Sequence, residues 1–190
     1  MRNGGRRAEV RRRLEAAAAP GRVFRRGPRV GRAVWLFPAA LALHVLEEAP
    51  GFTEWVNRYA SRRYTSGDFV RINALGLVGT TAGTLAVARS RNRALFFLYY
   101  TALLTQQAAF NPLFHAGTTA KFRAYSPGLV TSVALFPPLW YSLTRLAVRE
   151  GLLTRGKVAG ALVIGGLLHT VAVAEQVFSV ELTRLRRGGA

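Results

Sequence analysis

The stretch VAGALVIGGLLHTVAVAEQVF, residues 158–178, decides the fold class of this chain. It is twenty-one residues long, and Glu175 is the one residue in it with a formal charge. A helix needs about 20 mostly apolar residues to cross the hydrocarbon core of a bilayer. The apolar residues do not alternate with the period of two that a barrel strand requires. The stretch therefore predicts a membrane-spanning helix, which we extend to residue 179.

Four more segments of this kind precede it and are separated by short charged or turn-rich joints. They cover residues 33–49, 69–88, 94–116 and 128–148. A chain of 190 residues has the length of a single domain. We therefore expect an all-α fold, a polytopic membrane bundle of about five transmembrane helices over residues 33–179. The chain has no cysteine, which excludes disulfides, thiolate metal sites and cysteine nucleophiles.

The net charge of +18 is concentrated at the amino terminus. Residues 1–32 hold eleven arginines and two glutamates, and Phe24 is their one aromatic residue. A single-strand nucleic-acid surface places aromatic rings among its basic residues, so this pattern favours membrane lipids over nucleic acid as the partner. We expect a disordered cytoplasmic tail that fixes the topology, and a basic carboxy-terminal tail at 180–190 on the outer side.

The three histidines of the chain all fall within predicted spans. His44 lies near the carboxy-terminal end of the first span, His115 near that end of the third, and His169 at or just past the middle of the fifth. Odd-numbered spans of such a chain run in the same direction. The topology therefore predicts that all three imidazoles lie in the same half of the membrane.

Further polar residues accompany these histidines. Glu47 and Glu48 follow His44 at i+3 and i+4, so we expect all three on one helical face. Asn111 lies one helical turn before His115. Glu175 is turned roughly 120° away from the face of His169 and is not assigned to the site.

The glutamate pair needs compensation, because a charged group at mid-membrane costs roughly 2.5 to 3.5 kcal/mol on insertion scales. Three compensating groups fit the sequence: a metal ion, a proton shared between the two carboxylates, or a basic group such as Arg71. In the third case the cluster would only tie the first span to the second.

Imidazole and carboxylate ligands suit zinc, iron or manganese. We expect His44, His115 and His169 as metal ligands and either Glu47 or Glu48 as a further ligand. The other carboxylate would act as a general acid or base, and Asn111 would orient a ligand or bind substrate. This predicts a metal-dependent enzyme, a hydrolase or an oxygen-activating enzyme, acting on a lipidic or apolar substrate.

Two alternatives stay open at this stage. One is a metal-free acid–base enzyme, an isomerase or cyclase, in which the glutamates donate and accept protons. The other is a transporter, scaffold or lipid-binding protein without catalytic activity.

Two segments carry a family resemblance. LHVLEEAPGF at 43–52 and NPLFHAGTTAKFRAYSPGLVTSVALFPPL at 111–139, followed by His169, resemble the HXXEE family of bacterial membrane proteins. The resemblance extends over residues 33–179. It implies a multi-pass protein of the bacterial inner membrane with a shared polar site, but no particular reaction. The residue types of the first span are also similar to those of sterol-isomerase-like membrane proteins, which supports the acid–base alternative.

Overall fold

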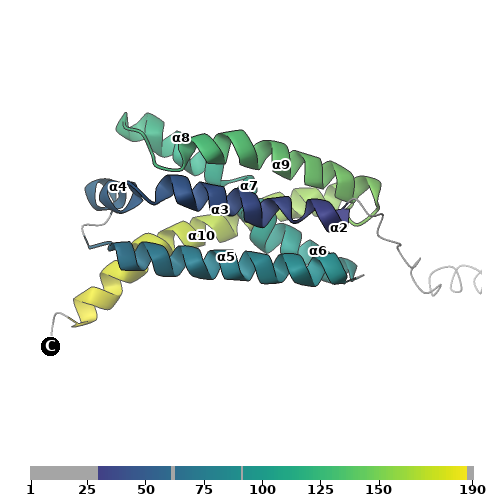
Figure 1. The fold of residues 1–190 in the computed structure, drawn as a ribbon, viewed down its shortest axis with the longest axis horizontal. Coiled ribbons are helices and arrows are strands. Elements are labelled where there is room, and N and C mark those ends of the chain that lie inside the picture. The colour runs from purple at the N-terminus through teal and green to yellow at the C-terminus, as the bar shows by residue number, and fades with distance from the viewer. Residues whose placement is uncertain (1–29, 61–62, 91, 188–190) are drawn as a thin grey trace, which may run out of the picture.

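A computed structural model describes residues 30–60, 63–90 and 92–187, with the side chains of the last helix placed up to Ala174. All regular structure in this part of the chain is helical (Figure 1). The helices are α2 Val30–Ala33, α3 Leu36–Glu48, α4 Phe52–Tyr59, α5 Ser66–Arg89, α6 Arg93–Tyr99, the π-helix η1 Tyr100–Thr105, α7 Gln106–Ala108, α8 Asn111–Phe122, α9 Leu129–Arg149 and α10 Arg155–Arg187. The expected all-α bundle is therefore confirmed.

Three helical stretches are long and apolar enough to cross a membrane. Among the described residues these are Val30–Glu48, Ser66–Arg89 and Arg155–Ala174. They correspond to the first, second and fifth of the predicted spans. Residues 1–29 of the expected basic tail lie outside the described residues, and so do residues 188–190. The side chain of Glu175 is also outside the described part of the chain.

The third predicted span, 94–116, is not one continuous α-helix. The chain passes from α6 through the π-helical turn η1 into the short helix α7, and a separate helix α8 begins at Asn111. Pro112 lies in the first turn of α8, where its missing amide hydrogen is tolerated, whereas inside a longer helix it would remove a hydrogen bond. The proline thus explains why a new helix starts here.

The long helices lie roughly along the long axis of the molecule, with α3 between α5 and α9 in the view of Figure 1. Helix α10 packs against η1 and α7. Small residues allow this contact: a Cβ atom at Gly165 would lie 3.1 Å from Thr105 Cγ2. Gly83 likewise lets α5 approach α6 and η1, since a Cβ there would lie 3.3 Å from Tyr99 Cδ2 of α6 and 2.6 Å from Leu103 Cδ1 of η1.

Two clusters of buried side chains stabilise the bundle. The larger one joins α2, α3, the end of α5, α6, η1, α7, α9 and the start of α10, and it includes the fully buried Phe37, Tyr100 and Phe136. The smaller one is largely aromatic and lies where α4 meets the start of α5, around Phe52 and Trp55. The polar site lies beside this aromatic cluster, at the carboxy-terminal end of α3.

Candidate metal centre

Three buried side chains from two helices converge at the end of α3. His44 and Glu48 are one helical turn apart on α3, and His115 reaches them from α8. Nε2 of His44 and Nε2 of His115 each lie 3.4 Å from Oε1 of Glu48. All three residues are less than a tenth exposed. We call these three residues the triad.

The spacing of the triad fits a metal ion. One ligand atom from each residue can be chosen so that all three lie within 4.8 Å of one another. Two ligands that bind a metal at about 2.1 Å in tetrahedral geometry lie about 3.4 Å apart. This is the separation between Glu48 Oε1 and each Nε2 atom. The triad can therefore close around an ion with little movement.

The other nitrogen of each imidazole is held by a hydroxyl group. Nδ1 of His44 lies 3.0 Å from Thr131 Oγ1, and Nδ1 of His115 lies 2.9 Å from Ser126 Oγ. A histidine that ligates a metal usually donates its other N–H to such a partner, which fixes the tautomer and the ring orientation. With Nδ1 protonated, the lone pair of each Nε2 atom points into the triad.

The triad lacks a positive charge if both histidines are neutral. Nε2 of His115 is buried and has no hydrogen-bond partner among the described residues. The Nε2 lone pairs and the Glu48 carboxylate are all electron-rich, and a buried carboxylate without a cation or a donor is costly. A proton or a metal ion between these groups removes that cost.

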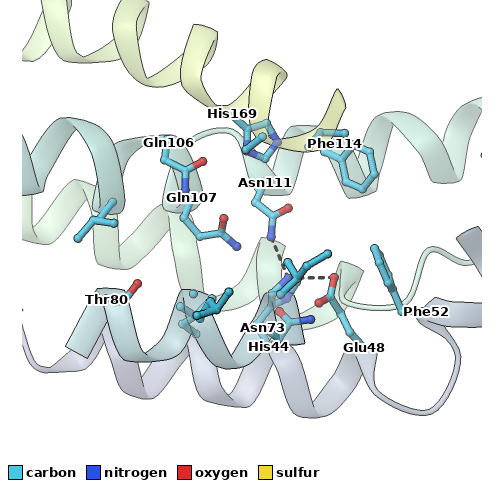
Figure 2. A pocket seen from close by; sticks show the side chains of 18 of the residues that line it. His44, Glu48, Phe52, Asn73, Thr80, Gln106, Gln107, Asn111, Phe114 and His169 are labelled. Carbon is cyan, nitrogen blue, oxygen red and sulfur yellow. Dashed lines mark hydrogen bonds and ion pairs between the residues drawn. The ribbon is translucent and has the colours of Figure 1, made fainter. Parts of the chain in front are cut away.

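Asn111 contacts the triad directly. Its Nδ2 atom lies 2.8 Å from Nε2 of His44 and donates to it, as Figure 2 shows. Asn111 is itself buried at the start of α8, one turn before His115. This contact occupies the His44 Nε2 lone pair that a metal would need, so the expectation that Asn111 orients a ligand or binds substrate stays a prediction.

Glu47 is not part of the triad, contrary to the expectation that it shares one site with Glu48. Its carboxylate accepts hydrogen bonds from the backbone N–H groups of Val130 and Thr131 and from the hydroxyls of Thr131 and Tyr125. These amides belong to the first turn of α9, where a carboxylate is favourable. Adjacent residues of a helix differ by about 100° in direction, so Glu47 faces α9 while Glu48 faces α8.

The pKa of the Tyr125 phenol, which neighbours the Glu47 carboxylate, is raised. Partial burial and the hydrogen bond to Glu47 raise the pKa of the Tyr125 phenol to about 12. Both effects disfavour the phenolate, because it would be poorly solvated and would lie beside a second negative charge. Tyr125 therefore remains a donor to Glu47 over the physiological pH range.

Gly128 belongs to the site but was not among the expected residues. Its φ is 96°, a backbone conformation that favours glycine. A Cβ atom at this position would lie 2.5 Å from His44 Cε1, 2.9 Å from Glu48 Cγ and 2.9 Å from His115 Cε1. The feature of the sequence that points to this glycine is the turn YSPG, residues 125–128, between α8 and α9. The turn supplies both the Ser126 hydroxyl and a glycine backbone that packs against the triad.

A cavity of about 500 Å³ opens in front of the triad. All three histidines line it, which confirms the expectation that they gather in one place. Glu48 and Asn111 line it as well, and Glu47 does not. Its polar wall also includes side chains of α5 and α7, namely Arg71, Asn73, Thr80, Gln106 and Gln107.

His169 lies in the wall of this cavity but outside the triad. Figure 2 shows it on α10, with Asn111 between it and His44. Its ring packs against Phe110 and Phe114, with centroid separations of 6.4 Å and 6.3 Å. The ligand group found among the described residues contains His44, Glu48 and His115 only. The expected role of His169 as a ligand is therefore not supported by its placement, because α10 packs across the cavity from α3.

A family model described as "Protein of unknown function with HXXEE motif" matches residues 35–143. The match covers the whole triad together with Glu47, Asn111 and Gly128, and it ends before His169. No curated protein and no solved structure matches the chain.

Proposed function

Because this chain belongs to the HXXEE family, for which no function is known, we propose a function from its own site: a metal-dependent membrane enzyme. His44, Glu48 and His115 are the proposed ligands. The substrate is a lipidic or apolar molecule that enters the adjoining cavity. The observation that carries the proposal is the convergence of two Nδ1-anchored imidazoles on one buried carboxylate, at the spacing of metal ligands.

Two histidines and one carboxylate leave coordination positions open. This ligand set occurs in zinc hydrolases, and in iron(II) enzymes that activate oxygen. The three residues line a cavity of about 500 Å³, which is large enough for a small-molecule ligand. If His44 held an ion through Nε2, the Asn111 amide would no longer bond to that nitrogen and would be free to orient a bound substrate.

Glu47 has a positioning role in this proposal. Its carboxylate holds the Thr131 hydroxyl, and that hydroxyl accepts from Nδ1 of His44. The ligand His44 is therefore oriented by a carboxylate through one intervening threonine. The proposal replaces the general acid–base role expected for Glu47 from the sequence.

The direct test is metal analysis of the full-length protein purified in detergent. We expect near-stoichiometric zinc, iron or manganese in the wild type, and its loss in His44→Ala, Glu48→Gln and His115→Ala. Gln107→Ala is the matched control, because Gln107 lines the same cavity outside the triad. Zinc would favour hydrolysis, because it has no redox chemistry, whereas iron would be compatible with oxygen activation. Metal-free wild type, or metal retained in all three variants, would refute the metal centre.

A metal-free acid–base enzyme is the second candidate, and one observation favours it. A chain of hydrogen bonds runs from His44 through Thr131 to Glu47 and on to Tyr125, which is about half exposed. Such a chain can pass a proton between the buried triad and the surface. In that case the wild type contains no stoichiometric metal. Glu48→Gln and Thr131→Val then abolish turnover while the fold is retained.

A further inference from the structure

A second cavity, of about 580 Å³, lies beside the first. It is lined mainly by α4, α8 and α10. Of the described residues that line it, none carries a formal charge, and seven are aromatic: Phe52, Trp55, Tyr59, Tyr64, Phe110, Phe114 and Phe122. We call it the aromatic chamber. Its composition suits an apolar group and offers no partner for an ionic one.

The aromatic chamber and the cavity of the triad share a wall. Phe52, Phe114, His169 and Val173 line both. Figure 2 shows Phe52 and Phe114 at the side of the triad cavity where Glu48 lies. The two cavities therefore meet at these side chains.

The chamber is bounded on one side by α10. Thr170, Val173 and Ala174 line it, and they belong to the stretch Arg155–Ala174, which is long and apolar enough to cross a membrane. Leu167 and Val171 on the same stretch are mostly exposed. In a bilayer the exposed face of this helix would contact lipid chains, so an apolar occupant would have a short route into the chamber.

We propose that the aromatic chamber binds the single acyl or prenyl chain of an amphiphilic substrate whose polar group reaches the triad. The inference rests on the proposed function for the polar end of that substrate. The chain site itself depends only on the chamber.

Trp55 provides a direct readout of occupancy. It lines the chamber and is 7% exposed, and the chain has two other tryptophans, Trp35 and Trp140. A full-length protein carrying Trp35→Phe and Trp140→Phe keeps Trp55 as its single tryptophan. A fatty acid brominated at mid-chain quenches tryptophan fluorescence on contact, so it serves as the probe.

We expect saturable quenching of Trp55 that is reversed by the unbrominated fatty acid or by a prenol. Stronger competition by one of these two compounds identifies the type of chain. Thr170→Phe fills the chamber and should weaken probe binding by at least about tenfold, since the added ring takes the volume of the chain. The control is Val171→Phe on the same helix, because Val171 is 62% exposed and lines neither cavity. It should bind the probe like the parent.

Quenching that does not saturate, or that is equal in Thr170→Phe and Val171→Phe, would overturn the inference. Circular dichroism and gel filtration confirm that each variant is folded. The outcome is separable from that of the metal centre: probe binding that persists in His44→Ala, together with wild-type protein free of metal, supports the chamber and refutes the metal centre. Wild-type protein that contains metal but shows no saturable quenching supports the metal centre and refutes the chamber.

Discussion

Gly128 packs directly against His44: a Cβ atom at position 128 would lie 2.5 Å from His44 Cε1. The backbone of the turn between α8 and α9 thus forms the back of the triad. Since Glu48 and His115 are nearly as close to the same point, a methyl group there would displace all three proposed ligands.

Gly128→Ala should therefore impair both metal binding and stability. The positive φ alone costs about 1–2 kcal/mol for a residue with a Cβ atom, and the contacts with the triad add to this. We expect a lower melting temperature and at least about a tenfold loss of metal affinity. Gly76→Ala is the matched control, because Gly76 lines the same cavity and a Cβ there meets nothing within 4 Å. Equal behaviour of the two variants would contradict the packing described for Gly128.

The two adjacent glutamates should respond differently to the same substitution. Glu47→Gln replaces one accepting oxygen by an NH₂ group that faces the N–H groups of α9, and we expect destabilisation by about 1–3 kcal/mol with metal still bound. Glu48→Gln removes a proposed ligand and should abolish metal binding. Denaturant unfolding and metal analysis of both variants check the prediction. Loss of metal in both, to the same extent, would argue against separate roles.

His169→Ala should retain the metal. His169 contributes to the wall of both cavities but lies outside the triad. We expect near-wild-type metal content and weaker probe binding in the aromatic chamber. His115→Ala, measured alongside it, should lose the metal. A metal-free His169→Ala protein would restore the role expected for this residue from the sequence.

Tyr125 should ionise at a higher pH than an ordinary tyrosine. Its pKa is raised to about 12 from an ordinary value of 10.0, so the folded protein holds the phenolic proton more tightly than the unfolded chain. The contribution to stability is therefore complete below pH 10 and is lost as the pH rises to about 12. The tyrosinate absorbance of the wild type minus that of Tyr125→Phe should rise near pH 12 in the folded protein, and near pH 10 in denaturant. A difference that rises near pH 10 in both states would exclude the hydrogen bond to Glu47.

The fold class and the gathering of the histidines were predictable because they depend on helix length and direction. Apolar runs of membrane length imply helices, and parallel helices bring residues at similar heights to the same level. This reasoning holds for His44 and His115, which lie in one site. The interruption of the helix within residues 94–116 was not predictable from apolarity alone. Pro112 and the π-helical turn break the α-helix, but the segment stays apolar throughout.

Glu47 and Glu48 have different roles because they face different helices, and the sequence does not specify which helices these are. The pattern places both near His44, but it does not reveal that α9 lies on one side of α3 and α8 on the other. Gly128 was missed for a related reason: a glycine in a turn is ordinary, and only its contact with three side chains distant in sequence gives it a role in the site.

The hydrogen bonds of Glu47 to the first turn of α9 also have a consequence for biosynthesis. Thr131 follows Glu47 by 84 residues. At about 5–20 residues per second, a ribosome needs on the order of ten seconds to deliver this partner. During that interval the nascent first helix carries Glu47, whose native donors have not yet been synthesised. We expect the Glu47 carboxylate to remain in contact with water until the first turn of α9 has been synthesised and has packed against α3.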